Sequence, residues 1–309
     1  MSTRLILDSG LVVAGHGRHF MVETPEGKRL ICHPRGKKSL AVVGDRVLWQ
    51  ATGDEGTIEK IEERRNLFYR QDEIRTKSFA ANLDQVLILI AAEPEFSESQ
   101  LTRALIAAQA EHILPIIALN KSDLSEAFAR AWQRLEPYRR MGYTVLPVAL
   151  KPRGGETASP TPLLLQHLTG KTTLVLGPSG SGKSTLINLL VPQAQALTGE
   201  ISSALNSGKH TTTSTNWYWV DAARTTALID SPGFQEFGLQ HIAPMHLASL
   251  MPDIGHWSKN CRFYNCTHLH EPGCGVIAAV GAPTENNGIS PLRYKLYSEL
   301  FAELSQRRY

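Results

Sequence analysis

The chain has 309 residues, 42% of them hydrophobic and 20% charged, and its formal net charge is +3 at pH 7. This composition is typical of a soluble globular protein, and the length allows two or three domains. The longest apolar run, residues 86–92, is too short to span a membrane, and Asp8 interrupts the N-terminal segment too early for a secretory signal. We therefore expect a cytoplasmic protein without a membrane segment.

Residues 1–76 are predicted to form a small β-barrel. Short apolar runs separated by glycine-containing turns are typical of such folds, and they lie at residues 11–14, 19–22, 29–32 and 46–49. Basic residues lie between and after these runs: His33, Arg35, Lys37, Lys38, Arg64, Arg65, Arg70, Arg75 and Lys77. These charges fit either a solvated surface or a face for the phosphate backbone of RNA, so a five-stranded oligonucleotide-binding barrel (OB-fold) is our expectation.

Residues 77–242 alternate between strand and helix patterns. We expect strands at residues 85–90, 114–119, 143–148, 172–176 and 226–229, and helices at residues 99–112, 125–141 and 184–190. Repeated β–α units predict a mainly parallel sheet with helices on both faces. The remaining residues, 243–309, are predicted to form a small α domain that ends in a helix near residues 291–306.

A phosphate-loop motif lies between a predicted strand and a predicted helix. It reads Gly177-Pro-Ser-Gly-Ser-Gly-Lys183-Ser184. Glycines let successive backbone N–H groups turn toward phosphates, and a helix N-terminus adds positive potential. We expect Lys183 to reach the β- and γ-phosphates and Ser184 to bind Mg²⁺. The predicted nucleotide contacts in this loop are Gly177, Ser179, Gly180, Ser181, Gly182, Lys183, Ser184 and Thr185.

A guanine-reading motif, Asn120-Lys121-Ser122-Asp123, follows another predicted strand. The carboxylate of Asp123 can accept hydrogen bonds from the guanine edge, which adenine does not offer in that pattern, and the aliphatic stem of Lys121 can cover the base. Asn and Asp are common in loops, so this tetrapeptide alone is weak evidence. It becomes strong evidence in combination with the phosphate-loop motif. Together the two motifs predict a GTP site.

Switch-like residues complete the predicted site. Asp230-Ser-Pro-Gly233 follows an apolar strand, and there Asp230 would hold Mg²⁺ while the Gly233 N–H would meet the γ-phosphate. Upstream, Thr212 or Thr213 would complete the Mg²⁺ shell; the pattern does not choose between them. Phe234 stands where many GTPases carry a water-orienting glutamine, and its ring cannot do this. His210 is the candidate replacement, with a surface or structural role as its alternative.

The order of these motifs is the most informative feature of the sequence. The base-reading motif at residue 120 precedes the phosphate loop at residue 177, which precedes the aspartate at residue 230. An ordinary small GTPase has the phosphate loop first and the base-reading loop late. The order therefore predicts a circularly permuted GTPase domain.

Three of the four cysteines lie close together with a histidine: Cys261, Cys266, His268 and Cys274. Three thiolates and one imidazole match a tetrahedral structural zinc site, and clustered cysteines in a cytosolic chain indicate metal rather than disulfides. A redox role is less favoured because no CxxC spacing is present. Cys32 stands apart and is expected to be a small buried apolar residue.

These features together resemble the RsgA (YjeQ/YloQ) family of ribosome small-subunit-dependent GTPases. The resemblance rests on the permuted motifs, on Gly208-Lys-His-Thr-Thr-Thr213 and on the run from Cys261 to Cys274, and it covers nearly the whole chain. It implies an OB-fold barrel, a permuted GTPase domain with Mg²⁺, and a zinc domain. It also implies late maturation of the 30S ribosomal subunit, contact with 16S rRNA, and a monomer whose GTP hydrolysis the subunit stimulates.

Two other functions remain open at this point. One is an RNA-binding scaffold that holds GTP structurally and barely hydrolyses it, which the phenylalanine at position 234 keeps possible. The other is a P-loop ATPase or small-molecule kinase, against which Asp123 predicts a strong preference for guanine.

Overall fold

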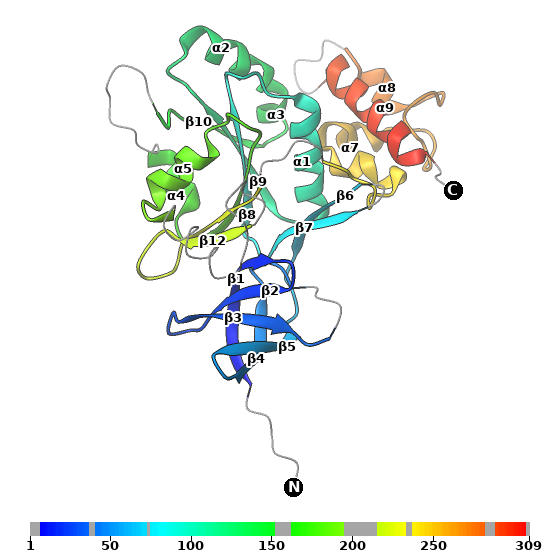
Figure 1. The fold of residues 1–309 in the computed structure, drawn as a ribbon. Coiled ribbons are helices and arrows are strands. Elements are labelled where there is room, and N and C mark those ends of the chain that lie inside the picture. Colours follow the sequence, from blue (N-terminus) through cyan, green and yellow to red (C-terminus); the bar gives the residue numbers. More distant parts are fainter. Residues whose placement is uncertain are drawn as a thin grey trace.

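The computed structural model describes most of the chain. The described residues are 7–36, 41–72, 75–151, 162–194, 215–232, 237–281 and 288–306. Three parts follow one another along the sequence: an N-terminal barrel, a central layered domain and a C-terminal group of helices (Figure 1). The expected multidomain class, with an α/β centre and a small helical C-terminal part, is confirmed.

Five strands form the N-terminal barrel: β1 (Asp8–His16), β2 (His19–Glu23), β3 (Arg29–Pro34), β4 (Arg46–Thr52) and β5 (Glu55–Ile61). β1 pairs antiparallel with both β2 and β4, and β3 pairs parallel with β5, so the strands close on themselves. Alternate residues point inward, as the period of a strand requires, and they build a separate core that includes Val12, Trp49 and Ile58. Cys32 belongs to this core with no exposed surface, and burial raises its pKa to about 12, as expected for an apolar role.

A two-stranded hairpin connects the barrel to the central domain. β6 (Leu67–Gln71) and β7 (Thr76–Ala81) pair antiparallel. Its aromatic residues Phe68 and Phe79 pack against Phe237, which follows the predicted switch motif in sequence. The hairpin therefore packs against Phe237, just after that motif, and links this part of the central domain to the barrel.

The central sheet has the strand order β10-β9-β8-β11-β13-β12. The strands are β8 (Gln85–Ala91), β9 (Leu114–Asn120), β10 (Thr144–Pro147), β11 (Thr172–Leu176), β12 (Asn216–Trp219) and β13 (Ala227–Asp230). All pairings are parallel except that of β12 with β13. The mainly parallel sheet is thus confirmed, and the antiparallel β12 was not expected from the sequence.

Helices cover both faces of this sheet. Side chains of β8 alternate between two cores, with Ile88 on one face and Leu87 and Leu89 on the other. α1 (Glu98–Ala110) packs on the first face, while α4 (Pro162–Leu168) and α5 (Lys183–Leu190) pack on the second. Burial on both faces explains why the strands read as continuous apolar runs.

The single helix expected at residues 125–141 is wrong. The segment forms two helices, α2 (Ser125–Arg134) and α3 (Glu136–Arg140), which meet at Leu135. Pro137 has no N–H to donate to the preceding turn, so it is tolerated only in a first turn, and it stands near the start of α3. The buried ring of Tyr138 then fixes α3 against the core.

The C-terminal part consists of short helices and one long one. They are η1 (Pro244–Leu250), α7 (Pro252–Ser258), α8 (Gly275–Ala279) and α9 (Pro291–Ser305). α9 lies beside α1 in Figure 1, and Glu303 of α9 forms an ion pair with Arg103 of α1. Among the described residues, no helix combines the length and apolar character that crossing a membrane requires.

Candidate nucleotide site and metal centre

The phosphate loop connects β11 to the N-terminus of α5. Two of its glycines have left-handed backbone conformations, Gly180 with φ of +79° and Gly182 with φ of +101°. Only glycine adopts such values without strain. Gly182 is also the N-cap of α5, and no side chain caps that end. The first N–H groups of the helix are thus available to an anion, as at other helix N-termini.

Asn120 joins the base-reading loop to the phosphate loop. It ends β9 and is 4% exposed. Its Nδ2 donates to the carbonyl of Ser181 at 2.9 Å, and its Oδ1 accepts from the N–H groups of Lys121 (2.8 Å) and Leu150 (3.1 Å). One buried side chain therefore sets the spacing of two loops that are 61 residues apart in sequence.

The two loops touch so closely that glycine is required at the contact. A Cβ atom on Gly182 would lie 2.3 Å from Nδ2 of Asn120. A Cβ atom on Gly177 would lie 2.5 Å from the carbonyl oxygen of Leu89 in β8. These glycines thus have two roles. They allow the close approach of neighbouring segments, and they let the loop turn its backbone N–H groups toward a ligand.

The other base-reading residues lie in the turn after β9. Lys121 has a left-handed backbone with φ of +69°, and its ammonium donates to the carbonyl of Glu93. Asp123 follows in the same turn and is half-buried. The backbone of Ser122 is fixed to Val148 beyond β10 by a hydrogen bond of 3.0 Å.

Lys183 and Asp230 meet at the carboxyl ends of neighbouring strands. Asp230 ends β13, and the register of β13 with β11 pairs it with Val175, next to the phosphate loop. Nζ of Lys183 lies 2.5 Å from Oδ1 of Asp230 and donates to the carbonyl of Ser231 at 2.6 Å. The hydroxyl of Ser231 in turn donates to Val175 at 2.9 Å. No signal in the sequence distinguishes Ser231, and its role is visible only in these contacts.

The structure thus brings most of the predicted nucleotide residues to one edge of the sheet. Ser179, Ser184 and Thr185 lie in the phosphate loop or the first turn of α5, and Ser184 is exposed there. Four predicted residues lie outside the described residues: His210, Thr212, Thr213 and Gly233. The same holds for Phe234 and for Lys37 and Lys38 of the basic run.

Part of the basic run has an internal role. Arg64 forms a bidentate ion pair with Asp45, at 2.7 and 2.8 Å, and the Asp45 carboxylate is fully buried. The hydrogen bonds that Arg64 donates to this carboxylate raise the pKa of its guanidinium. Arg65 binds Asp84 at 3.0 Å and the carbonyl of Asn82 at 2.9 Å. These two arginines tie the barrel to the connection that follows it.

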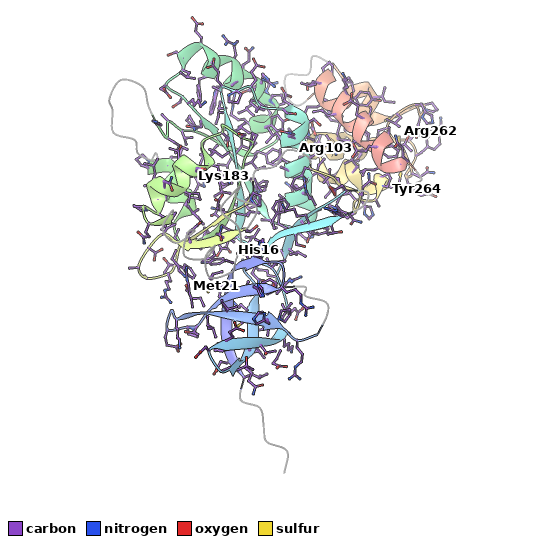
Figure 2. The ribbon with its side chains drawn as sticks, viewed as in Figure 1. His16, Met21, Arg103, Lys183, Arg262 and Tyr264 are labelled. Atoms are coloured by element: carbon purple, nitrogen blue, oxygen red, sulfur yellow. The ribbon has the colours of Figure 1, made fainter. Side chains whose placement is uncertain are left out.

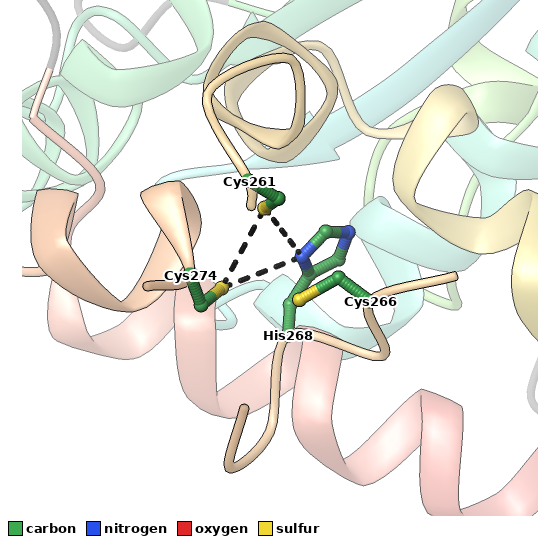
Figure 3. Close-up of side chains that lie close together, drawn as sticks. All are labelled: Cys261, Cys266, His268 and Cys274. Carbon is green, nitrogen blue, oxygen red and sulfur yellow. Dashed lines mark hydrogen bonds between the residues drawn. The ribbon is translucent and has the colours of Figure 1, made fainter. Parts of the chain in front are cut away.

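Four predicted metal ligands converge in the C-terminal part, as Figure 3 shows. The ligand atoms of Cys261, Cys266, His268 and Cys274 all lie within 4.8 Å of one another. Sγ of Cys261 is 3.4 Å from Nδ1 of His268 and 3.8 Å from Sγ of Cys274, which is 3.5 Å from the same nitrogen. Burial lowers the pKa of His268, so its imidazole is neutral at pH 7, as a metal ligand must be. The cluster can hold a metal ion.

The loop between the last two ligands is held from both sides. The carboxylate of Glu271 accepts from the N–H and hydroxyl of Thr267 and from the N–H of Leu269. Burial alone would raise its pKa, but these hydrogen bonds, first the one from the Thr267 side chain, hold the pKa of Glu271 below its usual range. Tyr294 and Tyr297 of α9 donate to the carbonyls of His268 and Thr267 at 2.8 and 2.9 Å. α9 therefore supports the metal-ligand loop directly.

Comparison with known proteins decides the family. A family model described as RsgA GTPase matches residues 61–240. The chain belongs to the RsgA GTPase family. The expected resemblance is confirmed, and since the members of this family are GTPases, the scaffold with negligible hydrolysis is not favoured.

Relatives of the RsgA GTPase family align over almost their whole length. A protein of Variovorax paradoxus named "Small ribosomal subunit biogenesis GTPase RsgA" is 74% identical over 305 residues, which is 98% of this chain and 95% of the relative. A protein of the same name from Paraburkholderia phytofirmans is 51% identical over 312 residues, covering 99% of this chain and 95% of its own.

Two solved structures have the same fold. The crystal structure of YloQ, described as a circularly permuted GTPase, superposes with a TM-score of 0.69 at 28% identity, covering 100% of this chain and 99% of that one. YjeQ from Thermotoga maritima gives a TM-score of 0.71 at 30% identity, covering 98% and 100%. The predicted circular permutation of this RsgA-family chain is thereby confirmed.

Proposed function

We propose that this chain binds GTP with Mg²⁺ and hydrolyses it during late maturation of the 30S ribosomal subunit, which stimulates the reaction. The observation that carries the nucleotide part is the meeting of three motifs at one sheet edge, through Asn120 with Ser181 and Lys183 with Asp230. The names of the Variovorax and Paraburkholderia relatives support the ribosomal part.

The base would lie over the turn after β9. There the carboxylate of Asp123 would accept from the guanine edge, and the aliphatic stem of Lys121 would cover one face of the base. Asn120, the first predicted nucleotide residue of this motif, also joins the loops: its amide donates to Ser181 and its oxygen accepts from Lys121 and Leu150. Its role would be to fix the distance between the base and the phosphates.

The phosphates would lie in the loop from Gly177 to the start of α5. Backbone N–H groups of Gly180, Ser181 and Gly182 would surround them, with the side chains of Ser179 and Thr185 close by, and Lys183 would bind the β- and γ-phosphates. Nζ of Lys183 now contacts Asp230, so it would exchange a carboxylate for phosphate oxygens when GTP binds.

The residues around Lys183 fit a magnesium ion, because they offer the hydroxyl and carboxylate oxygens that Mg²⁺ prefers. Ser184, Asp230 and Thr213 would hold the ion, with Thr212 as the alternative to Thr213. Bound there, it would neutralise charge that develops on the β- and γ-oxygens.

Hydrolysis also needs a group that orients water. Phe234 cannot do this, and we assign the role to His210, while the N–H of Gly233 would hold the γ-phosphate. A subunit that places His210 against the water would accelerate the reaction, so turnover would be slow without that partner.

The metal of the C-terminal centre is proposed to be structural zinc. A tetrahedral ion bound by sulfur at about 2.3 Å and nitrogen at about 2.0 Å separates its ligand atoms by about 3.5–3.8 Å. The separations of 3.4, 3.5 and 3.8 Å among Cys261, His268 and Cys274 fit that geometry, and Sγ of Cys266 lies within 4.8 Å of the other ligand atoms. Three thiolates and an imidazole leave no open position, so Cys261, Cys266, His268 and Cys274 would have no catalytic role.

The remaining assignments complete this proposal. We assign residues 1–76 to an RNA-binding domain, 77–242 to the GTPase domain and 243–309 to the zinc domain. The chain would act as a monomer in the cytoplasm and contact 16S rRNA. Exposed basic residues of the barrel such as Arg35, which is paired with Glu59 at 2.9 Å but 67% exposed, would add to the binding of RNA phosphates.

The deciding experiment measures GTP hydrolysis with and without purified 30S subunits. We expect a large increase with subunits and its loss in His210→Ala; equal rates with and without subunits would refute the proposal. If subunits still stimulate His210→Ala, the water-orienting role of His210 is rejected, while the proposed GTPase function stands. In competition assays GDP should displace bound nucleotide and ADP should not, and Asp123→Asn should weaken GDP binding without improving ADP binding.

A further inference from the structure

The loop between the first two metal ligands carries an exposed aromatic pair. Its sequence is Cys261-Arg-Phe-Tyr-Asn-Cys266. Tyr264 is fully exposed, at 103% of its reference area, and Phe263 is 40% exposed. In Figure 2, Tyr264 and Arg262 lie at the outer side of the C-terminal part, far from Lys183. This loop is therefore not part of the nucleotide site.

Tyr264 differs from the other tyrosines of the C-terminal part. Tyr294 and Tyr297 use their hydroxyls to hold the metal-ligand loop, and Tyr297 is buried. Within the described part of the chain, Tyr264 takes part in no hydrogen bond or ring contact. Its side chain thus contributes nothing visible to folding, and a large exposed ring beside a second one marks an interaction surface.

The loop is held in place without Tyr264. Its two ends are metal ligands, and the N–H of Arg262 donates to the carbonyl of Gly273 at 3.0 Å. Gly273 has φ of +73°, and a Cβ atom there would lie 3.2 Å from Cβ of Arg262. The chain segments around Arg262 and Gly273 therefore pack closely against each other. The backbone of such a loop has little conformational entropy left to lose on binding.

The charge around the rings favours an anionic partner. Residues 258–265 contain Lys259 and Arg262 but no carboxylate. The guanidinium of Arg262 lies over the ring of Phe263, 5.5 Å from its centroid. The nearby carboxylate of Glu271 is turned inward, where it accepts the hydrogen bonds of Thr267. The exposed face thus combines cations with aromatic rings.

From these observations we infer that Tyr264 stacks on an unpaired base of RNA, with Lys259 and Arg262 beside the adjacent phosphates. Unpaired bases are recognised by aromatic rings and by guanidinium planes in this way. Lys259 and Arg262 beside the rings favour RNA over a protein partner, because cationic and aromatic side chains together bind the backbone and bases of single strands. The inference rests on the proposed function, because it needs RNA of the small subunit as the ligand.

Binding of purified 30S subunits at fixed salt tests the inference. Base stacking on an aromatic ring corresponds to about 5- to 150-fold in affinity, so Tyr264→Ala should weaken binding within that range. Tyr264→Phe keeps the ring and should bind like the parent chain. Met245→Ala is the matched control, since Met245 is 50% exposed in the same part of the chain. Equal affinity of Tyr264→Ala and the parent would overturn the inference.

A photo-crosslinking amino acid at position 264 identifies the class of partner. We expect a crosslinked product with the 30S subunit that ribonuclease digests; a product that resists ribonuclease and is a protein–protein conjugate would overturn the inference in favour of a ribosomal protein. If the parent chain does not bind subunits, the proposed function itself fails. Basal GTP hydrolysis should be the same in Tyr264→Ala and the parent, since the loop lies away from the nucleotide site.

Discussion

The side-chain amide of Asn120 donates a hydrogen bond of 2.9 Å to the backbone carbonyl of Ser181. One residue ends the strand before the base-reading turn, and the other lies within the phosphate loop. This contact between residues 61 positions apart holds the base-reading turn next to the phosphate loop, although the two motifs occur in permuted order in the sequence. The same contact makes the geometry of the nucleotide site depend on the side chain of Asn120.

Asn120→Ala should weaken GDP binding strongly. The substitution leaves the N–H of Leu150 and the carbonyl of Ser181 without their partner, which costs about 1–3 kcal/mol per buried group. A roughly tenfold or greater loss of affinity is expected in a titration with fluorescent GDP. Asn66→Ala is the control, because Asn66 makes a similar pair of bonds to Leu83 outside the site. Equal affinities of the two variants would contradict this account.

Gly182→Ala should abolish nucleotide binding. The new Cβ would lie 2.3 Å from Nδ2 of Asn120, and φ is +101° there, so the loop must move. Gly142→Ala is a matched control with φ of +87° and no atom within 4 Å of the new Cβ. It should lose about 1–2 kcal/mol of stability and keep full GDP affinity. The measurements are thermal unfolding and GDP titration, and retained binding in Gly182→Ala would show that the contact does not matter.

Removal of the metal should unfold the segment from Cys261 to Cys274, which carries the four ligands. Apart from the ligands, the segment has few buried side chains, so the binding free energy of the ion is expected to act as folding free energy. Treatment with a strong chelator should release about one zinc per chain, measured by mass spectrometry, and should increase proteolysis between Cys261 and Cys274. Cys32→Ser should keep the zinc, because Cys32 lies in the barrel core. If the protein contains no zinc after purification from a medium that supplies zinc, the assignment is refuted.

Arg293→Met should destabilise the packing of the C-terminal part on the central domain. Arg293 of α9 is 2% exposed, binds Asp253 at 2.8 and 3.0 Å and donates to Thr102 of α1 at 2.8 Å. Loss of one member of a buried pair leaves an uncompensated charge and costs about 3–5 kcal/mol. Chemical denaturation should register this loss.

Lys295→Met on the same helix is the control for Arg293→Met. Lys295 lies 3.7 Å from Glu299, and both side chains are more than half exposed. Exposed pairs of this kind contribute about 0–1 kcal/mol, so this variant should unfold like the parent. Comparable losses in both variants would show that burial of Arg293 is not the cause.

The sequence by itself determined the local chemistry of this protein. Residues close in sequence define a phosphate loop, since the glycines and the lysine must lie within one turn, and they also define the cluster from Cys261 to Cys274. Mainly apolar runs of four to six residues predicted the central strands other than β12, because a strand buried on both faces is mostly apolar. From these motifs and their order the family could be predicted.

Tertiary structure decided what depends on contacts between distant segments. The strand β12, Asn216–Trp219, was not predicted; its place in the sheet comes from pairing with β13 and with β1 of the barrel. The break before α3 and the buried pair of Arg293 with Asp253 likewise follow from packing. The Lys183–Asp230 contact depends on the register of β11 with β13, which sequence motifs do not encode because a register is fixed by the whole sheet.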